Sequence, residues 1–114
     1  MLTTLALTTI LYTGTLTEVH SCVDYDCRLI SRPRTTCQVR TRFDLNGRFG
    51  EVIGSAEAFG HAFEQHWFQT GDTDGTHGQN GMLTLTLFFK GKLKTAYYSE
   101  YSDRRTYKRF TCRF

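Results

Sequence analysis

The residues that decide the fold are Thr36–Leu45, which read TCQVRTRFDL, together with Asn46-Gly47 and Arg48–Ile53, which read RFGEVI. Apolar and polar residues alternate in the first run, as expected of a β-strand with one face toward a core and one toward water. Asn-Gly between two such runs is the strongest short-range signal for a β-hairpin, because a type I′ turn needs positive φ at both central residues. We therefore predict an antiparallel hairpin that places Arg42 opposite Glu51.

The residues that follow this hairpin have the spacing of an amphipathic helix. Phe59, Phe63 and Trp67 recur at intervals of four residues, which would bring them to one side of a helix. Ser55 has the side-chain oxygen that an N-cap requires. We predict a helix over about 55–70 that packs these aromatic side chains on one face of a sheet.

The remaining segments alternate as strands do, or contain the residues of turns. The further predicted strands are Leu2–Tyr12, Thr15–Cys22, Arg28–Ser31, Met82–Phe89, Lys92–Tyr101 and Arg104–Phe114. We predict a turn at Thr13-Gly14 and a loop over Asp72–Gly81, which is rich in Gly and Asp. Since the clear connections are short, the pairing should be antiparallel. The predicted fold class is therefore α+β, an antiparallel sheet of about six to seven strands with one amphipathic helix packed on one face.

The chain has 114 residues, which predicts a single domain over residues 1–114. Its net charge is only +3, but the charges are unevenly distributed. Residues 28–48 carry six arginines against one acid, residues 49–74 carry five acids and no base, and residues 75–114 carry eight bases against two acids. Two basic blocks thus flank an acidic block, and we expect the acids to lie on the helix, behind the basic strands.

The basic residues of two predicted strands alternate onto single faces, and aromatic residues accompany them. Basic side chains bind phosphates, whereas aromatic rings stack on unpaired bases. We therefore predict a non-enzymatic protein that binds single-stranded DNA or RNA, or folded RNA, on a basic and aromatic sheet face. The predicted binding residues are Arg40, Arg42, Lys90, Lys92, Lys94, Arg105, Tyr107, Arg109 and Arg113. The order of four strands, one helix and more strands resembles that of Whirly- and PUR-type single-strand-binding proteins.

Three alternatives compete with this prediction. In the first, the arginines lie on an ordinary solvated face and pair with nearby acids. Those acids are Glu51, Glu100 and Asp103. In the second, a protein–protein interaction or assembly module, such as a small viral or mobile-element structural or inhibitory protein, uses the apolar residues on both faces of Leu2–Tyr12 to form an oligomer. In the third, a small ribonuclease uses a histidine beside a carboxylate, such as His61 near Glu57 or Glu64 on the helix.

The four cysteines are Cys22, Cys27, Cys37 and Cys112. We expect buried thiols in a reducing compartment, because no basic residue precedes the apolar run Leu2–Leu11 and threonines interrupt it, unlike a signal peptide. Two disulfides in a secreted chain, or a zinc site that adds His20, are the alternatives. We accordingly favour an intracellular location and expect no cofactor, no metal and no membrane-spanning run.

Overall fold

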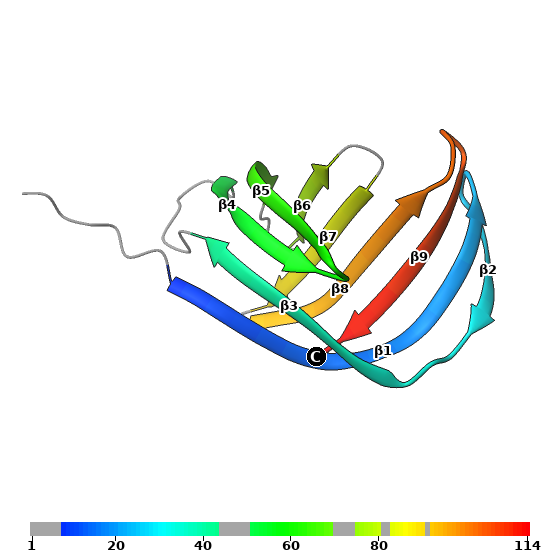
Figure 1. Ribbon diagram of the computed structural model, residues 1–114, viewed down its shortest axis with the longest axis horizontal. Helices are drawn as coiled ribbons and strands as arrows, with labels where there is room; N and C mark the ends of the chain where they lie inside the picture. The colour runs from blue at the N-terminus through cyan, green and yellow to red at the C-terminus, as the bar shows by residue number, and fades with distance from the viewer. Residues whose placement is uncertain (1–7, 44–50, 70–74, 81–82, 91) are drawn as a thin grey trace, which may run out of the picture.

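One antiparallel β-sheet forms the fold, and it curves until its two end strands touch (Figure 1). The computed structural model describes residues 8–43, 51–69, 75–80, 83–90 and 92–114. Its strands are β1 (Thr8–Val23), β2 (Asp26–Ser31), β3 (Thr35–Phe43), β4 (Glu51–Ala58), β5 (His61–Gln69), β6 (Gly75–Asn80), β7 (Leu83–Lys90), β8 (Lys92–Tyr101) and β9 (Thr106–Arg113). Their order across the sheet is β5-β4-β3-β1-β9-β8-β7-β6, and the two end strands, β5 and β6, are in contact. The remaining strand, β2, pairs with β1 and is not part of this series. The sheet is therefore a nearly closed up-and-down barrel.

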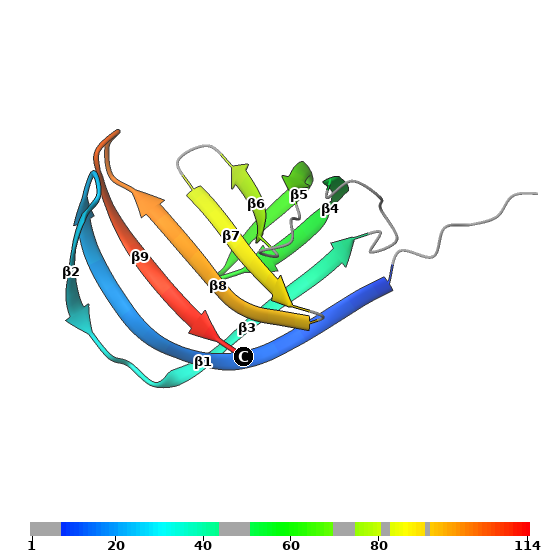
Figure 2. The same ribbon diagram turned by 180° about the vertical axis from the view of Figure 1, so that it is seen from behind.

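The longest strand, β1, lies between β3 on one side and β9 on the other (Figure 2). It pairs with β3 over Thr8–Leu16 and with β9 over Thr15–Val23. The predicted turn at Thr13-Gly14 is therefore wrong, because the strand runs straight through it. A side chain at Gly14 would collide with the carbonyl oxygen of Arg113 and would lie 2.8 Å from Cδ1 of Phe114. Gly14 is thus explained by the close approach of β9 rather than by a change of chain direction.

The predicted helix over 55–70 is also wrong, and the α+β class with it, since the described residues contain no helix and form an all-β fold. Residues in that range form the hairpin of β4 and β5, in which Ala58 pairs with His61. The two residues between them, Phe59 and Gly60, have φ of 54° and 78°, as a type I′ turn requires. A spacing of four residues equals two periods of a strand as well as roughly one helical turn, so the aromatic pattern does not distinguish a strand from a helix. The resemblance to Whirly- and PUR-type proteins ends with the helix.

The antiparallel hairpin of β3 and β4 is confirmed, but its predicted register is wrong. Arg42 pairs with Ser55 and Arg40 with Glu57, instead of Arg42 with Glu51. Asn46-Gly47, on which the register was based, lies outside the described residues. The strands predicted over Arg28–Ser31 and over the last three segments are confirmed as β2, β7, β8 and β9. Part of the predicted loop forms β6, a strand without the apolar alternation that would identify it.

Two disulfides cross-link the sheet, so the expectation of free thiols is wrong. Cys22 bonds to Cys27 between directly paired residues of β1 and β2. Cys37 bonds to Cys112 and thereby joins β3 to β9, the two strands that flank β1. The buried core beside this second disulfide consists of Val39, Ala56, Ala58, Phe63, Leu85, Leu87, Leu93, Ala96 and Tyr98. These residues define the inner face of the sheet.

Candidate nucleic-acid interface

Four of the five predicted binding arginines share the outer face of the sheet, opposite the core. Strand pairing places Arg42 opposite Thr9 of β1, Arg40 opposite Leu11, Arg113 opposite Thr15 and Arg109 opposite His20. Because side chains alternate along a strand, and Val39 and Cys112 face the core, all four arginines project outward. We call this set the arginine stripe. From Thr9 to His20 it extends about 35 Å along β1, at roughly 3.3 Å per residue.

The stripe therefore combines two basic segments that are distant in sequence, but not as a purely basic surface. Arg40 lies 3.4 Å from Glu57, and Arg113 lies 3.4 Å from Glu18. Glu57 projects from β4 on the same face as Arg40, so the expected separation of acids behind and bases in front is wrong. Among the described residues, no ion pair is found for Arg42.

The predicted residue Arg105 is part of a separate ion pair at the turn between β8 and β9. Its Nη2 donates a hydrogen bond to the carboxylate of Asp24 at 2.6 Å, and this hydrogen bond lowers the pKa of Asp24. Among the described side chains, the acid partners of the arginines are thus Glu18, Asp24 and Glu57, and no ion pair joins an arginine to Glu100 or Asp103; the side chain of Glu51, the other expected partner, lies outside the described part. The ordinary-surface alternative correctly anticipated ion pairs, but with other partners.

Aromatic side chains occupy the outer face at the Arg109 end of the stripe. The guanidinium of Arg109 lies 5.6 Å from the ring centre of Tyr97. Tyr101 and Tyr107 lie 4.7 Å apart, ring centre to ring centre. The Tyr107 hydroxyl donates a hydrogen bond of 2.8 Å to the backbone oxygen of Asp24, which fixes the position of its ring. The sequence predicted that Tyr107 and Arg109 share a face, and they do, but the ring beside the Arg109 guanidinium is that of Tyr97, while Tyr107 contacts Tyr101.

The three predicted lysines lie at or near the turn between β7 and β8. Lys90 and Lys92 pair with each other where β7 ends and β8 begins. Lys94 is the extra residue of a bulge in β8, and its side chain is exposed. Because β8 pairs directly with β9, Lys94 lies next to Arg113 of the stripe, whereas Lys90 and Lys92 lie further along at the end of the β7–β8 hairpin.

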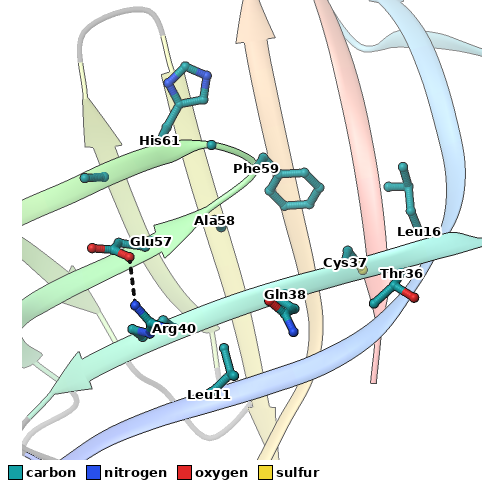
Figure 3. Close-up of a pocket in the computed structure, with 12 residues that line it drawn as sticks. Leu11, Leu16, Thr36, Cys37, Gln38, Arg40, Glu57, Ala58, Phe59 and His61 are labelled. Carbon is teal, nitrogen blue, oxygen red and sulfur yellow. Dashed lines mark hydrogen bonds and ion pairs between the residues drawn. The ribbon is translucent and has the colours of Figure 1, made fainter.

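An open hollow of about 800 Å³ lies beside Arg40, where the β4–β5 turn ends (Figure 3). The turn contributes Phe59 and His61, and the Arg40–Glu57 pair lies at one edge. Both rings stack against Tyr98, with centre-to-centre distances of 4.9 Å for Phe59 and 5.4 Å for His61. Burial raises the pKa of Tyr98 to about 12, and its hydroxyl has no hydrogen-bond partner among the described residues.

A second hollow, of about 600 Å³, lies on the outer face beside Arg113, and sequence reasoning missed it. Its lining residues are Thr15, Thr17, Glu18, Arg32, Arg34 and Arg113. The signal that could have found it is the Arg-Pro-Arg sequence at 32–34, in which two bases flank the only proline. That sequence links β2 to β3, and it was treated only as a connection.

The groups required by the ribonuclease and zinc alternatives are arranged differently from what the sequence suggested. His61 stacks on Tyr98 and does not lie on a helix with Glu57. Among the histidines whose side chains are described, His20 lies beside a carboxylate, 3.6 Å from Glu18. The zinc alternative fails because all four cysteines are disulfide-bonded. In the described ranges there is no cluster of three or more His, Cys, Asp or Glu that would hold a metal.

Within the part of the chain that the structure describes, no helix has the length and apolar character needed to cross a membrane. Comparison of the chain with protein-family models, with curated proteins and with solved structures found no match.

Proposed function

We propose that this protein binds single-stranded nucleic acid along the outer face of its barrel, with the arginine stripe against the phosphates. The observation that carries the proposal is the strand pairing, which aligns Arg42, Arg40, Arg113 and Arg109 along both flanks of one strand. The arginine stripe, about 35 Å long, can follow a nucleic-acid backbone over several nucleotides.

The ion pairs of the stripe do not prevent this binding. The side chains of Arg40 and Glu57 are 54% and 59% exposed, and those of Arg113 and Glu18 are 51% and 32% exposed. Ion pairs between such accessible groups contribute only about 0–1 kcal/mol. A phosphate can therefore replace a carboxylate at small cost, while Arg42 has no ion pair among the described residues to exchange.

The aromatic end of the stripe favours nucleic acid over other polyanions. Tyr97, Tyr101 and Tyr107 lie on the same face as Arg109, and base stacking on such rings contributes about 1–3 kcal/mol per base. Sugar rings can also contact tyrosine through their C–H groups, but they lack the planar aromatic face of a base. A larger loss of affinity for an oligonucleotide than for a sulfated polysaccharide on removal of a tyrosine ring therefore separates the two ligand classes.

The test compares two double variants that remove equal charge from opposite faces. Arg40→Gln/Arg42→Gln alters the stripe, whereas Arg28→Gln/Lys108→Gln alters exposed residues that flank Ser21 on the inner face. Fluorescence anisotropy with a labelled oligothymidylate should show weaker binding for the stripe variant. The slope of the logarithm of the binding constant against the logarithm of salt concentration should become shallower by about 1.4, because each single-strand phosphate contact contributes about 0.7. Equal effects of the two double variants would refute the proposal, as would displacement by a sulfated polysaccharide combined with no effect of Tyr97→Leu.

A second candidate is the assembly module, favoured by the exposed apolar residues around β2. Val23, Leu29 and Ile30 are 48%, 38% and 49% exposed, and Tyr25 is fully exposed. In the described residues β2 pairs only with β1, so its other edge is open to a further strand. We propose that a second copy pairs at this edge. Sedimentation should then show a mass that rises with concentration and falls back to the monomer in Leu29→Lys; a monomer at all concentrations would exclude it.

The two disulfides bear on the location of the protein as well. Disulfides persist in oxidising compartments and are rare where thiols are kept reduced. We therefore propose an oxidising compartment in place of the intracellular location expected from the N-terminal sequence.

A further inference from the structure

We propose that the hollow between the β1 bulge, the β2–β3 link and the end of β9 binds one phosphate group. Three arginines line it, Arg32, Arg34 and Arg113, against a single acid, Glu18. Guanidinium groups present planar pairs of donors that match the oxygens of a tetrahedral oxyanion. An excess of two positive charges in one hollow therefore selects a phosphate rather than a neutral or cationic ligand.

The backbone holds these residues in place from two sides. Thr17 is the extra residue of a bulge in β1, between the pairs Leu16–Cys112 and Glu18–Thr111. Its hydroxyl donates a hydrogen bond of 3.4 Å to the backbone oxygen of Thr111. Bulges redirect the chain at the point where they interrupt a ladder, and Thr15, Thr17 and Glu18, on either side of this one, all line the hollow.

The link between β2 and β3 is held equally well. Arg34 has a φ of 56°, a backbone conformation that residues other than glycine rarely adopt. Its backbone N–H donates a hydrogen bond of 2.8 Å to the carbonyl oxygen of Leu16, next to the bulge. The link is thereby anchored to β1 at the residue where the hollow begins, and Arg32 and Arg34 stay beside it.

Glu18 acts as an internal competitor for the same cations. It lies 3.4 Å from the guanidinium of Arg113 and 3.6 Å from Nε2 of His20. An incoming phosphate must displace this carboxylate from Arg113, which weakens binding. Removing the charge of Glu18 should therefore tighten phosphate binding, an effect opposite to that of a variant that merely damages the fold.

The position of the hollow gives the inferred site a role that rests on the proposed function. Arg113 belongs both to the hollow and to the arginine stripe, between Arg40 and Arg109 along β1. One backbone phosphate of a bound strand would sit in the hollow, while its neighbours contact the remaining arginines. The hollow would thus set the position of the strand along the stripe.

The experiment measures the binding of inorganic phosphate to the full chain at low ionic strength, by calorimetry and by the NMR shifts of the arginine side chains. Arg32→Gln should weaken phosphate binding at least about tenfold, because a charge-assisted hydrogen bond is lost. Glu18→Gln should tighten it. Arg104→Gln, an exposed arginine outside the hollow, should leave it unchanged. Arg34 is avoided because its positive φ makes any substitution a test of the backbone too.

A matched measurement with the oligothymidylate separates this inference from the proposed function. Arg32→Gln should weaken binding of both phosphate and oligonucleotide, whereas Arg40→Gln/Arg42→Gln should weaken that of the oligonucleotide alone. If phosphate fails to bind, or binds Arg32→Gln and Arg104→Gln equally well, the site is refuted while oligonucleotide binding can still stand. If phosphate binds as expected but no oligonucleotide does, the hollow remains a phosphate site and the proposed function fails.

Discussion

Removing the Cys37–Cys112 disulfide should destabilise this protein far more than removing the Cys22–Cys27 disulfide. A cross-link stabilises a fold mainly by lowering the entropy of the unfolded chain, and its effect grows with the logarithm of the loop that it closes. Cys37 and Cys112 are 75 residues apart, which corresponds to about 4.5 kcal/mol. Cys22 and Cys27 are 5 residues apart, which corresponds to about 2 kcal/mol.

The assay is urea denaturation followed by far-UV circular dichroism, on Cys37→Ala/Cys112→Ala and on Cys22→Ala/Cys27→Ala. Each pair includes one fully buried cysteine, Cys112 or Cys22, so the loss of packing at that residue affects both variants. We expect the free energy of unfolding to differ by about 2.5 kcal/mol between them, with the β3–β9 variant the less stable. Equal losses, or a larger loss for Cys22→Ala/Cys27→Ala, would refute the reasoning, because the closed loop would then not determine the effect.

Three further predictions concern single residues. Gly14→Ala should lower the free energy of unfolding by about 1–3 kcal/mol, since the added methyl group meets the backbone of Arg113; unchanged thermal unfolding would show that β9 does not approach so closely. Burial raises the pKa of Tyr98 to about 12 from 10.0, so the folded state favours the neutral phenol, and the free energy of unfolding should fall as pH rises from 10 through 12. Tyr98→Phe should remove that loss without destabilising the protein at neutral pH, because the hydroxyl has no hydrogen-bond partner among the described residues. Ultraviolet titration and denaturation of both proteins measure the two effects. Asp24 has a lowered pKa because it accepts hydrogen bonds from Arg105. Its contribution to the free energy of unfolding is therefore fully present above its ordinary pKa of 3.8 and is lost as pH falls through its pKa in the folded protein. Asp24→Asn should make unfolding less sensitive to acid, and an unaltered acid transition would contradict this.

The strands were predictable wherever one face is buried and the other is not. In β3, β7 and β9 the alternation of apolar and polar residues largely matches the observed inner and outer faces. The register between β3 and β4 was not predictable from the Asn-Gly signal. Pairing Arg42 with Ser55 depends on which residues of β4 fit the interior of the barrel, where Ala56 and Ala58 are buried.

The two serious errors both concern residues whose local signal has more than one meaning. Phe59 and Phe63 are four residues apart, a spacing that fits a strand as well as a helix, and Gly60, inside the predicted helix, forms a tight turn. Gly14 was taken as a turn residue although it admits a neighbouring strand. In each case a long-range contact decides, and only the closed sheet supplies it: the stacking of Phe59 on Tyr98, and the approach of Arg113 to Gly14.

The candidate site shows the same limit. Alternation correctly predicted that Arg40 and Arg42 share one face, and likewise Arg109 and Arg113. It could not predict that β1 would lie between them, that Glu18 would pair with Arg113, or that the link at 32–34 would close a hollow beside it. Those facts depend on the order of strands in the sheet, which residues distant in sequence determine together.

The most direct test of the central claim is the salt dependence of oligothymidylate binding by the unmodified protein. If the four arginines of the stripe each contact one phosphate, the logarithm of the binding constant should fall with the logarithm of salt concentration with a slope of about −2.8. The slope should be close to −1.4 in Arg40→Gln/Arg42→Gln. A slope near zero, or one that the double variant leaves unchanged, would contradict the account.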